Sequence, residues 1–159
     1  MTTHESVLID TGPLIAFYNQ SDHYHRQICQ FFDQCHAKLV TTMPCVTEVM
    51  WLLSADWRVQ NEFVTDLASG LYDAVPLLPL DFARITELNR QYASIPADIT
   101  SLSLIAVSER LEINAIASFD KEFSHFRQHQ RKPFDLLLKI DGEQAPARLR
   151  TKRASFTLS

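Results

Sequence analysis

Short apolar runs alternate along the chain with longer stretches in which apolar residues recur every three or four positions. The first run, residues 7–9, ends at Asp10 and a Thr-Gly-Pro breaker, which predicts a buried strand and then a helix to about Tyr18. Further strands are expected over 38–42, 75–80, 114–118 and 134–138. Further helices are expected over 22–35, 44–54, 57–72, 81–94 and from 98 onward. This alternation predicts an α/β fold with a short parallel sheet of about four or five strands, flanked by helices on both faces.

Asp10 is the first candidate for chemistry. It is expected at the carboxyl end of the first strand, outside which open α/β sheets bind their ligands. An aspartate there, or Thr11 after it, is equally suited to cap the helix that follows. At this position alone, capping and ligand binding both stay open.

Glu48 is the second candidate. It is the only charge in a helix, expected over 44–54, whose apolar residues, Trp51 among them, cover almost every side. The pattern predicts a buried helix, in which a carboxylate costs several kcal/mol unless it is paired, hydrogen-bonded or bound to a metal. Capping does not explain a mid-helix residue, so a buried salt bridge to a distant arginine is the main alternative.

Two later acids complete a possible site. Asp98 begins a predicted helix and Asp120 follows the strand expected over 114–118, although each also fits a helix cap. Together with Asp10 and Glu48 they supply only oxygen donors, without histidine or cysteine. Such a set favours a hard ion, Mg²⁺ or Mn²⁺, over zinc.

Composition narrows the class of protein. A chain of 159 residues is expected to form one domain, here over 1–140, and residues 141–159 are expected to be a basic, mobile tail. The net charge is -4, yet the chain from Lys121 onward holds nine Lys or Arg against four acids. No apolar stretch has the length of a membrane span and no signal peptide is evident. We therefore expect a cytoplasmic protein that does not associate with a membrane. Three cysteines without close spacing predict reduced thiols.

Four segments in this order resemble the PIN-domain ribonucleases, especially the VapC-type toxins of bacterial toxin–antitoxin pairs. They are VLIDTGPLIAF, MPCVTEVMWLL, PADITSLSLIAVSERL and AIASFDKEFSHF, and the likeness spans about residues 7–138. It implies Mg²⁺- or Mn²⁺-dependent cleavage of RNA by Asp10, Glu48, Asp98 and Asp120. It implies that Asp10, Asp98 and Asp120 hold the metal, that Glu48 is a ligand or a general base, and that Thr11 and Ser118 support them. A homodimer and a small antitoxin partner are also implied.

Basic residues are needed for such a substrate. RNA binding requires cations along the phosphate backbone, and Arg127, Arg131 and Lys132 are the candidates for a basic stripe.

One position departs from the family pattern. Many relatives carry a second acid three residues after the one matched by Asp98, and here that place is Ser101. Residues three apart share a helix face, so Asp98 could serve instead. The alternative is a catalytically weakened PIN-like module that binds RNA or protein. An aspartyl-phosphate phosphatase is disfavoured because Gly12 stands where it needs an acid.

Overall fold

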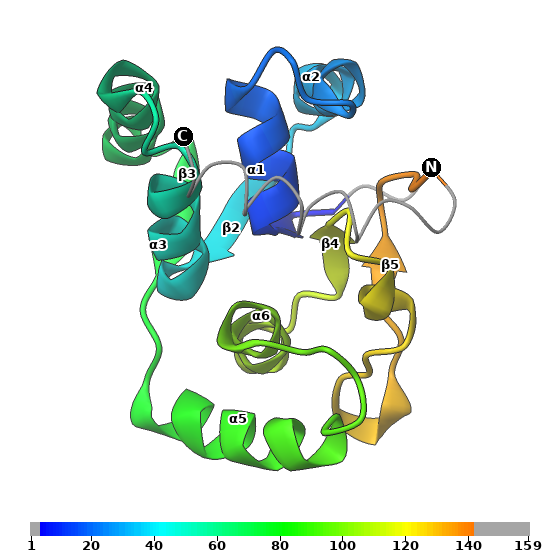
Figure 1. Cartoon of the computed structure of the whole chain (residues 1–159). Helices are drawn as coiled ribbons and strands as arrows, with labels where there is room; N and C mark the ends of the chain where they lie inside the picture. Colours follow the sequence, from blue (N-terminus) through cyan, green and yellow to red (C-terminus); the bar gives the residue numbers. More distant parts are fainter. Residues whose placement is uncertain (1–3, 142–159) are drawn as a thin grey trace.

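The computed structural model describes residues 4–141, which form one parallel sheet with helices on both sides (Figure 1). The strand order is β3-β2-β1-β4-β5, and every neighbouring pair is parallel. The strands are β1 (Ser6–Ile9), β2 (Lys38–Thr42), β3 (Tyr72–Val75), β4 (Ala115–Ala117) and β5 (Asp135–Leu136). The α-helices are α1 (Thr11–Tyr18), α2 (His25–Gln34), α3 (Met43–Leu52), α4 (Trp57–Ser69), α5 (Pro79–Gln91) and α6 (Ile99–Leu111). The predicted fold class is confirmed.

The alternation of side chains along each strand divides the core into two layers. In β1, Val7 and Ile9 pack in one layer and Leu8 in the other, as expected for a strand buried on both faces. The first layer also holds Leu14 of α1 and Phe63 of α4. The second layer is built mainly from α5, α6 and three phenylalanines that follow β4, namely Phe123, Phe126 and Phe134. Figure 1 shows α1, α2 and α4 on one side of the sheet and α5 and α6 on the other.

The third strand lies earlier in the chain than predicted. The sequence placed a strand over 75–80 and a helix over 57–72, whereas β3 is Tyr72–Val75. Helix α4 ends sooner because Gly70 takes the left-handed conformation, with φ of 86°, that closes a helix. Pro79 then opens α5, so the apolar run after Val75 is shared between a loop and a helix. The strand is at the sheet edge.

The start of α2 also differs. A helix was expected from Asp22, but α2 begins at His25. The Asp22 carboxylate accepts a hydrogen bond from the Tyr24 N–H at 2.8 Å, which is the local turn that aspartate favours over helix.

Helix α3 is less buried than its composition predicts. Val49 and Leu52 face the core, but Trp51 is 48% exposed, and Glu48 is half-buried. The prediction of a helix buried on almost every side was therefore wrong, because the number of apolar residues does not distinguish core residues from apolar residues on the surface.

Three further predictions concern membrane-spanning helices, the cysteines and the C-terminal tail. Within residues 4–141, no helix has the length and apolarity that crossing a membrane requires. Cys29, Cys35 and Cys45 are free thiols. The mobile tail was predicted over residues 141–159, and all of it except Asp141 lies outside the described part of the chain.

Candidate functional site

Asp10 lies where β1 passes into α1. Its backbone N–H donates to the Ala117 carbonyl at 3.0 Å, which ties it to β4. One carboxylate oxygen, Oδ1, accepts from the Thr11 N–H at 2.8 Å, and the other, Oδ2, accepts from the Ser118 hydroxyl at 2.7 Å. Only 7% of Asp10 is exposed. The carboxylate is thus buried at the carboxyl edge of the sheet.

Ser118 joins Asp10 to the segment that carries Asp120. Its hydroxyl donates to Asp10 and accepts a hydrogen bond from the Asp120 N–H at 3.0 Å. Asp120 in turn accepts, through Oδ1, from the Glu122 N–H at 3.0 Å and so caps the short 3₁₀ helix Lys121–Ser124. The structure therefore brings together the ends of β1 and β4, two strands that are far apart in sequence.

The pKa of the Asp10 carboxyl is raised by burial and by nearby acids. Burial raises the pKa of its carboxyl to about 7, and the negative charge of Asp120 adds to this effect. The hydrogen bonds from Ser118 and Thr11 act in the opposite direction, and the charge of Glu48 raises the pKa further. Glu48 reaches this region from α3, an element that starts at the carboxyl end of β2. Three of the predicted acids therefore interact.

Asp98 stands at the start of α6. Its Oδ1 accepts from the Ser101 N–H at 3.0 Å, so it is the N-cap of that helix. Helix α6 is held against the end of β2 by a 2.7 Å hydrogen bond between the Thr42 and Ser103 hydroxyls. Ser101 is buried and 6% exposed. Each of Asp10, Asp98 and Asp120 thus uses one carboxylate oxygen to cap the helical segment that follows it.

The donors suit a hard divalent cation. Thr11 places a buried hydroxyl beside Asp10, and in the described residues this Oγ1 has no hydrogen-bond partner. A cation would offset the repulsion that raises the pKa of Asp10, and oxygen donors are what Mg²⁺ and Mn²⁺ prefer. Burial raises the pKa of the nearby Cys45 thiol to about 12. Within residues 4–141, however, no three His, Cys, Asp or Glu side chains already stand in a metal-binding arrangement.

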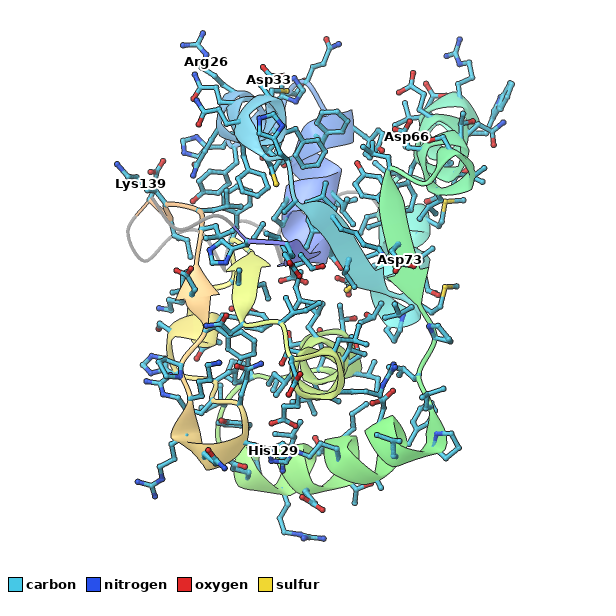
Figure 2. The ribbon with its side chains drawn as sticks, turned by 180° about the vertical axis from the view of Figure 1, so that it is seen from behind. Arg26, Asp33, Asp66, Asp73, His129 and Lys139 are labelled. Carbon is cyan, nitrogen blue, oxygen red and sulfur yellow. The ribbon has the colours of Figure 1, made fainter. Side chains whose placement is uncertain are left out.

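The predicted basic stripe is only partly available. The Arg127 guanidinium donates to the Ser124 and Phe126 carbonyls at 2.7 and 2.8 Å, so it is engaged by its own loop. Arg131 and Lys132 are exposed. They follow His129, which Figure 2 shows against α5, at the end of the molecule opposite Arg26 and Asp66.

Sequence reasoning missed the ion pairs that fix α5 to α6. Arg84 donates to both carboxylate oxygens of Glu109 at 2.8 and 3.0 Å, and Arg110 donates to the buried carboxylate of Asp81 at 3.1 Å. Asp81 is the third residue of α5, and its carboxylate also accepts from the N–H of the N-cap residue Leu78 at 2.8 Å. Its partner lies 29 residues away, with no signal in the sequence. These pairs anchor the helix that carries Asp98.

Comparisons with known proteins agree with this fold. The PIN domain family profile matches residues 7–128. No curated protein matches the chain. Similar solved structures include VapC20 of Mycobacterium tuberculosis, described as a sarcin-ricin loop cleaving toxin, at 16% identity and a TM-score of 0.70, covering 75% of this chain and 93% of that one.

Two complexes are also similar. A toxin–antitoxin complex from Klebsiella pneumoniae shares 14% identity with a TM-score of 0.61, covering 83% of this chain and 96% of that one. VapBC2 from Rickettsia felis, bound to a DNA fragment from its promoter, shares 11% identity with a TM-score of 0.59, covering 84% and 99%. At these identities the likeness establishes the fold.

Proposed function

This chain belongs to the PIN domain family, and we propose that it is a metal-dependent endoribonuclease that hydrolyses RNA phosphodiester bonds as the toxin of a toxin–antitoxin pair. The observation that carries the proposal is the buried Asp10 carboxylate at the carboxyl edge of the sheet, which the Ser118 hydroxyl links to the segment that carries Asp120. Burial and the charges of Asp120 and Glu48 raise the pKa of this carboxyl. A cluster of acids kept at a sheet edge against its own repulsion is a feature of functional sites more than of structural ones.

Each side chain has a proposed role. Asp10, Asp98 and Asp120 hold Mg²⁺ or Mn²⁺, and Glu48 is a further ligand or a general base acting through water. A bound divalent ion supplies water activation and stabilisation of the departing oxyanion. Ser118 keeps the Asp10 carboxylate oriented by donating to Oδ2. The Thr11 hydroxyl, buried beside Asp10, supports the same site.

Partners follow from the surface and from similar proteins. Large apolar side chains are exposed on α4 and α5, including Trp57 at 67%, Leu80 at 59% and Phe82 at 53%. Exposed apolar groups of this size suit protein contacts. We assign them to a small antitoxin and to a second copy of this chain, since two of the similar structures are toxin–antitoxin complexes.

A second candidate is a PIN-like module that binds RNA or protein without cutting it. Ser101 favours this candidate, because it replaces an acid at the start of α6 and its N–H is bonded to the Asp98 carboxylate. Both functions share the fold, so only an activity measurement separates them.

The test is RNA cleavage by the purified full chain with Mg²⁺ or Mn²⁺ and with EDTA. A nuclease cuts with metal, stops with EDTA, and loses at least a hundredfold in rate on Asp10→Asn or Glu48→Gln substitution, by the usual weight of such groups. Asp73→Asn and Glu62→Gln, at exposed or half-buried positions on β3 and α4, are the matched controls and keep full activity. Binding of RNA without metal-dependent cleavage would favour the module instead.

The toxin assignment has its own readout. Induced expression of the wild-type chain should arrest growth, and Asp10→Asn should relieve the arrest at equal protein level. Cleavage in vitro without growth arrest would leave a nuclease that is not a toxin.

A further inference from the structure

A chain of hydrogen bonds runs through the core from the start of α3 to the second turn of α6. Thr42 is the last residue of β2 and the N-cap of α3, and its Oγ1 accepts from the Cys45 N–H at 3.5 Å. The same Oγ1 lies 2.7 Å from the Ser103 hydroxyl of α6. The Ser103 hydroxyl in turn donates to the Thr100 carbonyl at 2.7 Å. Thr42 and Ser103 are fully buried, so water does not interrupt this hydroxyl link.

The Thr100 carbonyl determines the direction of the hydroxyl link. A carbonyl oxygen only accepts, so the single Ser103 hydroxyl proton is used on Thr100. Ser103 Oγ must then accept from the Thr42 hydroxyl, whose oxygen is the acceptor for Cys45. Without the Ser103 hydroxyl, the Thr42 proton would have only the Cys45 sulfur, a weak acceptor at 3.3 Å. Each hydroxyl therefore has a donor role and an acceptor role that an apolar side chain cannot replace.

The hydroxyl link joins the two helices that present Glu48 and Asp98. Glu48 lies three residues after Cys45 on α3, and Asp98 is the N-cap of α6. The two helices and the end of β2 are in contact with one another (Figure 1). After burial, the negative charge of Asp10 is the next largest cause of the raised pKa of the Cys45 thiol, so the link also passes near this acid. A shift of α3 against α6 would therefore change how the acids stand relative to one another.

We propose that Thr42 and Ser103 are positioning residues whose hydroxyls fix α3 against α6 and so set the geometry in which the acids bind a divalent cation. This inference rests on the proposed function. The two hydroxyls act through Glu48 and Asp98 and not on the cation itself, because their protons and acceptor sites are used within the link. Ligands on separate elements bind well only when they are held within about 0.5 Å of the productive geometry.

Helix α6 contains a matched control serine. Ser108 is fully buried like Ser103, and its hydroxyl also donates to the carbonyl three residues earlier, that of Ile105, at 2.6 Å. Its oxygen accepts from Gln128 Nε2 at 2.8 Å, in the segment between β4 and β5. The two serines therefore have the same kinds of partner. Ser103, however, joins α6 to the cap of α3, whereas Ser108 lies near the other end of α6 from Asp98.

The experiment measures Mn²⁺ binding to the purified full chain by titration calorimetry without RNA, and the free energy of unfolding in urea with EDTA. Ser103→Ala should weaken Mn²⁺ binding about tenfold, the usual effect of losing a residue that orients metal ligands. Ser108→Ala should lose a similar free energy of unfolding, since it removes equivalent hydrogen bonds, and should keep the wild-type Mn²⁺ affinity.

The Thr42 side chain provides an independent pair of variants. Thr42→Val keeps the shape of threonine without its hydroxyl and should weaken Mn²⁺ binding as Ser103→Ala does. Thr42→Ser keeps the hydroxyl and should keep the wild-type affinity. This pair tests the hydroxyl link even where Ser103→Ala fails to fold.

Two outcomes would overturn the inference and leave the proposed function intact. Wild-type Mn²⁺ affinity in folded Ser103→Ala and Thr42→Val proteins would show that the acids keep their geometry without the hydroxyl link. An equal loss of affinity in Ser108→Ala would assign the effect to a general weakening of α6. A wild-type chain that binds no Mn²⁺ would instead refute the proposed metal-dependent function, and this inference with it.

Discussion

Replacing Asp10 by asparagine should make the metal-free protein more stable while it removes the proposed activity. The folded state raises the pKa of this carboxyl from 3.8 to about 7, so the native chain disfavours the ionised form. Asparagine keeps an acceptor for the Thr11 N–H and a polar partner for the Ser118 hydroxyl, and it is an equally good cap. The substitution therefore deletes the unfavourable charge and little else.

The sign and the size follow from proton linkage. A raised carboxyl pKa means that the folded state binds more protons than the unfolded state between pH 3.8 and about 7, so stability falls as pH rises through this window. The full penalty is present above pH 7 and absent below pH 3.8. At about 1.4 kcal/mol per pKa unit, it amounts to about 4 kcal/mol at pH 8. Since Asp120 and Glu48 share the effect, we expect Asp10→Asn to gain about 2–4 kcal/mol.

Urea unfolding with EDTA present, at pH 5 and pH 8, measures this gain. The variant should exceed the wild type at pH 8, and the difference should shrink at pH 5. Asp56→Asn is the control, because Asp56 is an exposed cap whose pKa is lowered by Arg58, so it should show no gain. An Asp10→Asn protein that is no more stable than the wild type at pH 8, or a gain independent of pH, would refute the reasoning.

Two further predictions concern the supports of the site. Ser118→Ala should raise the pKa of Asp10 further, because a hydrogen bond to the carboxylate is lost. NMR titration of the Asp10 carboxyl measures this, and an unchanged or lowered pKa would contradict it. Arg110→Met should cost about 3–5 kcal/mol in urea unfolding, because it leaves the Asp81 carboxylate, 1% exposed, without its cation. Arg58→Met, on an exposed pair, is its control; equal stability of both variants would show that the buried pair is not needed.

Local signals predicted the element that carries Asp10. An apolar run, an acid and a Thr-Gly-Pro breaker define a strand end and a helix start within a few residues, so no long-range information was needed. The same holds for Asp98, whose capping role is set by its own helix. These positions follow from chemistry within one turn of the chain.

Other features depend on contacts that the sequence does not record. The edge strand β3 is short and contains Asp73, so its pattern is only weakly apolar. The strand was therefore predicted over the apolar run that follows it, residues 75–80. Trp51 is as apolar as a core residue but lies on the outside of α3. The hydrogen bond from the Ser118 hydroxyl to Asp10 links residues that are 108 positions apart in the sequence.

The pairing of β1 with β4 sets an order of events during synthesis. Leu8 aligns with Ile116 in the sheet, and Asp10 bonds to Ser118. At ribosomal speeds of about 5–20 residues per second, Asp10 is made roughly 5–20 s before its partner. A chain that is released before residue 118 is made therefore lacks the hydrogen bond that ties Asp10 to the end of β4.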